Sequence, residues 1–221
     1  MEQIKKHDFV EIEYTGKLKE ENIVFDTTDE KIAKENKLHN HDYCPVIICI
    51  GEQQILKGLD KNIEGKEIGK EYDFEIKPED AFGKKDAKLI QLIPISKFKQ
   101  QKIQPMPGMQ LNIDGVVGTV KIASGGRTLV DFNHPLAGKE LSYKIKINKK
   151  ITDDKEKLKG YLKLSLGTKD FETEINNSNA KISLKNEIPE EVKEKLSKKI
   201  TELIPNIKKA EFIVTKNEKN K

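Results

Sequence analysis

The residues that could bind a metal lie close together in one short segment. His39, His41 and Cys44 form an H-x-H-x-x-C cluster, whose residue types suit zinc. The segment around them is polar and typical of a loop, and a fourth ligand would have to come from elsewhere in the chain. We therefore interpret the cluster as part of a loop and expect no metal and no other cofactor.

No other set of residues has the pattern of a nucleophilic enzyme. The sequence contains no convincing Ser-His-Asp or Cys-His arrangement. His134 and Asp131 are near neighbours, but the string Asn-His-Pro-Leu-Ala-Gly is typical of a rigid return turn. Cys44 and Cys49 are five positions apart on an expected strand and would point to opposite faces, so we expect no disulfide.

Composition narrows the class of protein. With 221 residues, the chain suggests one or two domains, at roughly 100–200 residues each. Its 41 basic residues include a single arginine, Arg127, which argues against sequence-specific nucleic-acid binding, where the planar arginine fork is preferred. No apolar run approaches the ~18 residues that span a bilayer, and the first residues lack a secretion signal. We expect a cytoplasmic protein that binds neither nucleic acid nor membrane.

In the first half of the chain, we expect strands to position the functional site. Val10, Ile12 and Tyr14 alternate with polar residues, as do the residues of 72–76, so both segments read as half-buried strands. The continuous apolar run 45–50 predicts a strand that stops at Gly51. Residues 52–56 are expected to make one short helix that ends near Gly58.

The pattern changes after residue 84 and again after residue 151. Between them, runs at 89–95 and 109–113 and a glycine-bounded hairpin predict a second group of strands, and alternation at 141–147 predicts a long strand. A charged linker is expected at 152–157. Beyond it, alternating residues predict strands at 162–166, 171–175, 182–184 and 210–214, and Pro189 opens an amphipathic helix.

Several strings resemble one known family in their order and spacing. They are Tyr14-Thr-Gly16, Phe25-Asp-Thr-Thr28, Gly51-x4-Leu56-Lys-Gly-Leu-Asp60, Pro78-Glu-Asp-Ala-Phe-Gly83 and the return string Asp131 to Gly138. Together they resemble the FKBP-type peptidyl-prolyl cis/trans isomerases, and the interruption after Gly83 resembles the SlyD-like subclass. With its C-terminal extension, the whole chain resembles a long-chain archaeal member.

We expect an α+β fold with three parts, of which the resemblance implies the first two and the residue pattern after 157 predicts the third. Residues 1–83 and 129–151 would form the isomerase domain, an antiparallel sheet wrapped on a short helix. Residues 84–128 would form a mainly-β chaperone domain inserted in the flap. Residues 155–221 are expected to fold as a small α+β domain.

The resemblance also assigns a pocket. Its catalytic positions correspond to Tyr14, Phe25, Asp26, Leu56 and Phe82, and its substrate-contacting positions to Val46, Ile55, Leu59 and Tyr143. The Leu56 N–H is the expected donor to the substrate carbonyl. Leu59 stands where small single-domain members have tryptophan, and Phe82 replaces a tyrosine, so the expected pocket is less aromatic and lacks one hydroxyl.

Such a pocket needs no nucleophile. Rotation of an X–Pro bond breaks no covalent bond but crosses a barrier of ~20 kcal/mol. An apolar site can hold the proline ring and disfavour the polar planar amide relative to its twisted state. Asp26 either supports the twisted carbonyl electrostatically or anchors Tyr14. Taken singly, Tyr14, Ile55 and Leu59 read better as core; the ordered motifs favour a pocket.

The inserted segment has its own signal. Apart from Met1, the only methionines are Met106 and Met109, on a proline-bounded loop, and flexible thioethers suit a promiscuous apolar surface. We expect both to contact unfolded protein; the alternative is that the apolar residues here only fill the insert's own core.

Three functions compete on this sequence. The first is a prolyl isomerase with chaperone activity, which accelerates proline-limited folding and holds unfolded protein clients that contain X–Pro bonds. The second is a catalytically weak client-binding module, and the third is an RNA-associated factor. The Tyr14, Asp26, Ile55 and Leu56 set favours the first. Leucines of residues 162–166 and free sheet edges also suggest a homodimer through the C-terminal domain. The alternative is a monomeric accessory domain that adds another client-binding surface.

Overall fold

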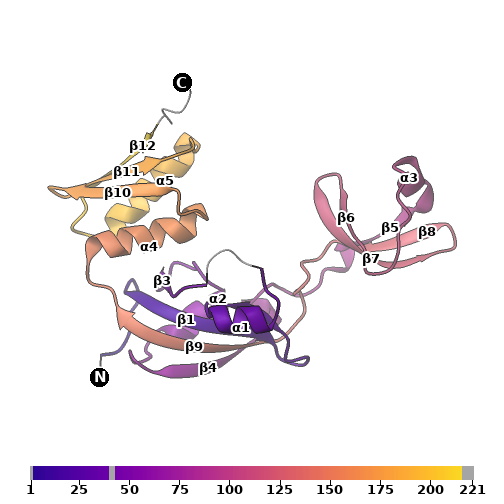
Figure 1. Cartoon of the computed structure of the whole chain (residues 1–221), viewed down its shortest axis with the longest axis horizontal. Coiled ribbons are helices and arrows are strands. Elements are labelled where there is room, and N and C mark those ends of the chain that lie inside the picture. The colour runs from indigo at the N-terminus through magenta and orange to yellow at the C-terminus, as the bar shows by residue number, and fades with distance from the viewer. Residues whose placement is uncertain (1, 40–42, 216–221) are drawn as a thin grey trace. The chain divides into compact units, whose positions relative to one another are not determined.

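The computed structural model describes residues 2–39 and 43–215, and the chain divides into two compact units (Figure 1). The first unit joins Met1–Glu75 to Ser142–Lys221, and the second is the continuous segment Ile76–Leu141. The second unit is therefore an insertion between two parts of the first.

A five-stranded sheet forms the framework of the first unit. Its strands are β1 (Phe9–Leu18), β2 (Val24–Thr27), β3 (Val46–Cys49), β4 (Glu71–Ile76) and β9 (Leu141–Lys150). The order is β2-β1-β9-β4, and β3 also pairs with β1. Two short helices accompany them, α1 (Glu30–Glu35), which Asp29 caps, and α2 (Lys57–Ile63). On β9 the predicted alternation is confirmed, because every second residue from Leu141 to Ile147 is buried.

The short helix predicted at residues 52–56 is wrong. Helix α2 begins only at Lys57, with Leu56 at its N-cap. Gly51 and Gln53 have positive φ angles of 90° and 53°, which an α-helix does not accommodate. The buried carboxylate of Asp60 accepts hydrogen bonds from the N–H groups of both residues and so fixes a loop here.

The second unit is built on a four-stranded antiparallel sheet in the order β5-β8-β7-β6. Its elements are the 3₁₀ turns η1 (Pro78–Asp80) and η2 (Ala87–Leu89), β5 (Ile90–Pro94), α3 (Ile95–Gln100), β6 (Gln110–Ile113), β7 (Val116–Ser124) and β8 (Arg127–Asp131). The expected end of the insert at residue 128 falls within β8. A small separate core consists of Ile93, Phe98, Leu111, Val120 and Val130.

The C-terminal part of the first unit is also α+β. It comprises α4 (Asp154–Leu166), β10 (Phe171–Asn176), β11 (Asn179–Leu184), α5 (Glu190–Leu203) and β12 (Lys209–Val214). Strand β10 runs antiparallel to β11, whereas β12 runs parallel to it after the α5 crossover. The three later strands and the helix after Pro189 were predicted from the sequence, and the α+β class is confirmed.

Helix α4 replaces both the linker predicted at 152–157 and the strand predicted at 162–166. Asp153 caps its first turn by accepting from the Glu156 N–H, and Gly167 ends it in the left-handed conformation. Leu158, Tyr161 and Leu162 are buried on one side at helical spacing. The alternating leucines fit either structure, and the two caps favour the helix.

The C-terminal part and the five-stranded sheet share one hydrophobic core. Phe9, Cys49 and Ile151 belong to the same buried cluster as Leu158 of α4 and Ile200 of α5. Leu158 and Leu162 of α4 are consequently used inside the chain, and the partly buried Leu166 packs against the same core. Among the described residues, no helix has the length and apolar character needed to cross a membrane.

Candidate active site

Three strands bring the predicted aromatic residues together. Tyr14 lies on β1, Phe25 and Asp26 on β2, and Tyr143 on β9, which is the neighbour of β1 on the other side. The Tyr143 ring centroid lies 6.0 Å from that of Tyr14 and 5.8 Å from that of Phe25, the latter in an edge-on contact. The Tyr14 hydroxyl donates to Asp26 Oδ2 at 3.1 Å.

Gly16 makes room for this cluster. A Cβ atom at this position would lie 2.7 Å from Cε1 and Cζ of Tyr143, which is too close for a Cβ–carbon contact. Gly16 also pairs with Asp26 in the β1–β2 register. The glycine in the Tyr14-Thr-Gly16 string is therefore required by the Tyr143 ring, which lies directly against the strand.

Burial governs the electrostatics of the cluster. It raises the pKa of the Asp26 carboxyl, an effect that the hydrogen bonds from the Tyr14 hydroxyl and the Thr27 N–H partly offset. Burial and the nearby Asp26 charge raise the pKa values of Tyr14 and Tyr143 well above their usual range. Both phenols therefore remain protonated at neutral pH, and Tyr14 acts as a hydrogen-bond donor.

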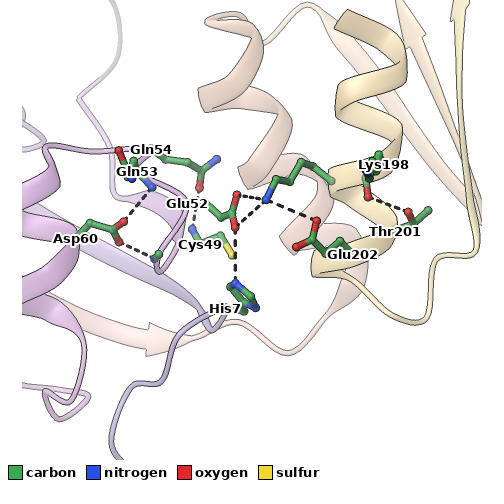
Figure 2. Close-up of polar contacts among 11 residues, drawn as sticks. His7, Cys49, Glu52, Gln53, Gln54, Asp60, Lys198, Thr201 and Glu202 are labelled. Atoms are coloured by element: carbon green, nitrogen blue, oxygen red, sulfur yellow. Dashed lines mark hydrogen bonds and ion pairs between the residues drawn. The ribbon is translucent and has the colours of Figure 1, made fainter. Parts of the chain in front are cut away.

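The loop after β3 presents Ile55 and Leu56. Asp60, which is 5 % exposed, accepts from Gly51 N and Gln53 N at 2.9 Å each (Figure 2). Both Ile55 and Leu56 are half-buried. The Leu56 N–H donates to no acceptor among the described residues, although the Leu56 carbonyl receives bonds from Leu59 and Asp60. A free N–H at this place can donate to a substrate carbonyl.

Two further predicted site residues of the first unit, Val46 and Leu59, lie on the elements that flank this loop. Val46 lies on β3 opposite Ile12 and is half-buried. Leu59 lies on α2 and is buried in the core. Its burial leaves little of the side chain for contact with a substrate.

Phe82, Met106 and Met109 belong to the second unit. The Phe82 ring stacks on His134 with a centroid separation of 4.4 Å. His134 Nδ1 accepts from the Leu136 N–H, as expected of a return turn. Both methionines are at least partly exposed, and Met106 is 59 % exposed.

The predicted loop cluster offers no assembled metal site in the part of the chain that is described. His41 lies outside the described residues. Cys44 Sγ contacts Lys163 Nζ at 3.4 Å. No group of three or more His, Cys, Asp or Glu residues with metal-binding geometry occurs in residues 2–39 and 43–215.

Sequence reasoning missed the residues that fix the Gly51–Leu56 loop. Glu52, Gln54 and Asp60 hold this loop, and Lys199 of α5 reaches it from the C-terminal part. The sequence included Asp60 only as the last residue of one motif and gave no indication that its carboxylate holds the loop. Lys199 is one of many lysines, and nothing in the sequence distinguishes it from the others.

Comparisons with known proteins agree with the motif order. A family profile described as FKBP-type peptidyl-prolyl cis-trans isomerase matches residues 1–103, and one described as FKBP26, IF domain matches residues 91–136. The chain is 35 % identical over 146 residues to the short-type peptidyl-prolyl cis-trans isomerase of Methanocaldococcus jannaschii, covering 65 % of this chain and 92 % of that protein.

Two bacterial proteins are also similar. The FKBP-type peptidyl-prolyl cis-trans isomerase SlyD of Helicobacter pylori is 31 % identical over 125 residues, which cover 55 % of this chain and 63 % of the relative. The FKBP-type 16 kDa peptidyl-prolyl cis-trans isomerase of Escherichia coli is 26 % identical over 150 residues, which cover 66 % and 93 % respectively.

Proposed function

The chain belongs to the FKBP-type peptidyl-prolyl cis-trans isomerases, and from this premise we propose that the half-buried Tyr14 and Phe25, which pack on the buried Tyr143, hold the proline ring of an X–Pro substrate. The observation that carries this proposal is the convergence of these rings with Asp26 from three different strands. An edge-on aromatic cluster offers a flat apolar ring a well-defined contact surface.

Catalysis follows from this environment without a covalent step. Twisting the amide removes its resonance and its large dipole, so an apolar surrounding disfavours the planar ground state relative to the twisted state. The Leu56 N–H donates to the substrate carbonyl, and Asp26 holds Tyr14 in place while presenting a partly desolvated carboxylate to the twisted bond. By resemblance, the half-buried Val46 and Ile55 complete the proposed site within the first unit.

The test is the isomerisation rate of an X–Pro tetrapeptide. Asp26→Ala is expected to lower kcat/KM at least about tenfold, because it removes both the Tyr14 partner and the charge. Asp73→Ala, which removes an exposed acid from β4, is the matched control and is expected to leave the rate unchanged. An unchanged rate in folded Asp26→Ala protein would remove Asp26 from the mechanism.

We further propose that the insert holds unfolded clients. Its core consists of five other residues, so its exposed apolar side chains are not needed to fill that core. The exposed set is Leu89, Ile90, Leu92, Met106, Met109, Val116, Val117 and Ile122. Exposed apolar surface of this kind is typical of protein interaction sites. Tethering a client in this way raises the local concentration of X–Pro bonds without changing the chemical step.

A catalytically weak client-binding module remains the alternative to a coupled isomerase and chaperone. The alternative requires refolding assistance that does not depend on Asp26. Proline-limited refolding of a protein substrate separates the two, because a coupled enzyme loses most of its acceleration in Asp26→Ala while a holding module retains it.

We also propose that two copies pair through β12. Of the leucines first considered for this role, Leu162 is buried in α4 while Leu164 and Leu166 are half-buried. Strand β12, by contrast, is an edge strand that pairs with β11 alone in the described sheet. Ile213 and Val214 are 36 % and 40 % exposed on it. Ending the chain at Lys150 would uncover the shared core, so a point variant is the better test. Ile213→Lys is expected to convert a sedimenting dimer to a monomer; a wild-type monomer at tens of micromolar would refute the proposal.

A further inference from the structure

Helix α4 contacts strand β3 with almost no space between them. A Cβ on Gly160 would lie 2.6 Å from Cβ and Cγ2 of Ile47. Glycine inside a helix costs about 1 kcal/mol relative to alanine. The close approach at this position therefore depends on glycine, and it fixes the C-terminal part beside β3, the strand that leads into the Gly51–Leu56 loop.

A second contact reaches the loop itself. Lys199 Nζ on α5 lies 3.0 Å from Glu52 Oε2 and 3.2 Å from Glu52 Oε1 (Figure 2). The Glu52 side chain is only 12 % exposed, and His7 Nε2 lies 3.7 Å from Glu52 Oε1. Glu202 Oε2 lies 3.6 Å from Lys199 Nζ. The hydrogen bond with Glu52 raises the pKa of Lys199, so the ammonium is charged at neutral pH. A little-exposed carboxylate of this kind requires such a partner.

Gln54 adds a third contact. Its Oε1 accepts from Cys49 N at 2.8 Å, at the end of β3, and its Nε2 lies 3.5 Å from the carbonyl oxygen of Tyr161 on α4. The loop is consequently held on one side by Asp60 of α2 and on the other side by two helices of the C-terminal part.

The loop conformation depends on these anchors. Gly51 and Gln53 both have positive φ angles, and the left-handed conformation is intrinsically unfavourable for glutamine. Ile55 and Leu56 follow within three residues. A loop that loses one anchor changes the direction in which the Leu56 N–H points, and small displacements of a positioning group are costly for catalysis.

We propose that Lys199 is a positioning residue of the isomerase site: through Glu52 it holds the loop that presents Leu56 to the substrate. The proposal rests on the function proposed above. It gives the C-terminal extension a direct part in the reaction, although none of its residues touches the substrate.

The experiment is a double-mutant cycle in the full-length protein, with the X–Pro tetrapeptide as substrate. Lys199→Met and Glu52→Gln are each expected to lower kcat/KM about three- to tenfold. Because both remove the same contact, the double variant is expected to lose no more than either single variant. Lys199→Arg preserves the charge and is expected to retain most of the activity. Lys198→Met, which changes the exposed neighbour on α5, is the matched control.

Hydrogen exchange supplies a readout that is independent of activity. The amides of Gly51 and Gln53 are expected to exchange faster in Lys199→Met than in Lys198→Met, while those of β1 are unchanged. Unaltered kcat/KM in Lys199→Met, or additive losses in the double variant, would overturn the proposal. If Lys199→Met does not fold, Glu52→Gln and Lys199→Arg decide instead. Unaltered kcat/KM in Glu52→Gln, or a loss in Lys199→Arg as large as that in Glu52→Gln, would overturn the proposal. Asp26→Ala, measured in parallel, separates failure of this inference from failure of the proposed site.

Discussion

The two apolar surfaces of this protein differ in how firmly their side chains are held. In the first unit, the Tyr143 ring contacts both Tyr14 and Phe25, and Tyr14 is also hydrogen-bonded to Asp26. In the insert, the large apolar side chains lie exposed on a small sheet whose core is made by other residues. A defined cluster suits one repeated chemical group, the proline ring, whereas an exposed surface with methionines suits many sequences.

Substitution of two glycines, one in each unit, is expected to give the largest difference between the two regions. A Cβ at Gly16 would meet Tyr143, and a Cβ at Gly118 on β7 would lie 2.5 Å from Cγ1 of the buried Val130. Gly16→Ala is expected to lower peptide kcat/KM about tenfold to hundredfold, because it displaces the ring. Gly118→Ala is expected to destabilise the insert by about 1–3 kcal/mol and leave the peptide rate nearly unchanged.

Tyr143→Phe controls for a merely structural effect at Gly16, since it keeps the ring and removes only the hydroxyl. Circular dichroism establishes that each variant is folded. Equal losses of peptide activity in Gly16→Ala and Gly118→Ala would mean that the insert is part of the catalytic structure.

Polar substitution of the insert surface tests the other side of the comparison. Leu92, Met106 and Val117 are 54 %, 59 % and 57 % exposed. Changing all three to serine is expected to slow assisted refolding of a protein substrate severalfold, because less apolar surface remains for the client. Peptide isomerisation should not change. Gln91→Ser with Gln110→Ser, two exposed polar positions of the same sheet, provides the control.

The smallest expected effect is on pH dependence, where one acid from each unit behaves oppositely. Burial raises the pKa of Asp26, so its charged form destabilises the fold as pH rises through that pKa. Asp26→Asn is therefore expected to be slightly more stable than the wild type at pH 7 and equal to it at pH 3.

Asp131 of the insert has the opposite sign. Burial alone would raise the pKa of its carboxyl, but hydrogen bonds from Asn133 and the charges of Lys85 and Lys121 lower it below the usual value. The charged Asp131 carboxylate stabilises the insert at pH values above the ordinary carboxyl pKa. This stabilisation is lost as pH falls through the lowered pKa. Asp131→Asn should destabilise the insert by about 1 kcal/mol at neutral pH and less at pH 3. Thermal unfolding at both pH values measures each difference.

Local sequence patterns predicted most of the strands, but not the contacts that hold the Gly51–Leu56 loop. Alternation identified β9 because every second side chain is buried, and Pro189 identified the start of α5. The same alternation failed at 162–166, where helix caps at Asp153 and Gly167 outweighed three leucines. The Lys199–Glu52 contact joins residues 147 positions apart, and its formation depends on packing of α4 against β3, which no short window of sequence contains.

The sheet order has a consequence for biosynthesis. Strand β9 lies between β1 and β4, although it is the last of the five strands to leave the ribosome. The isomerase sheet therefore has a gap at its centre until residue 150 has been made. The insert, whose sheet is formed entirely by residues 90–131, has all its strands before that moment. Since units fold as they emerge, the insert is complete on the nascent chain while the unit that contains the proposed isomerase site still lacks its central strand.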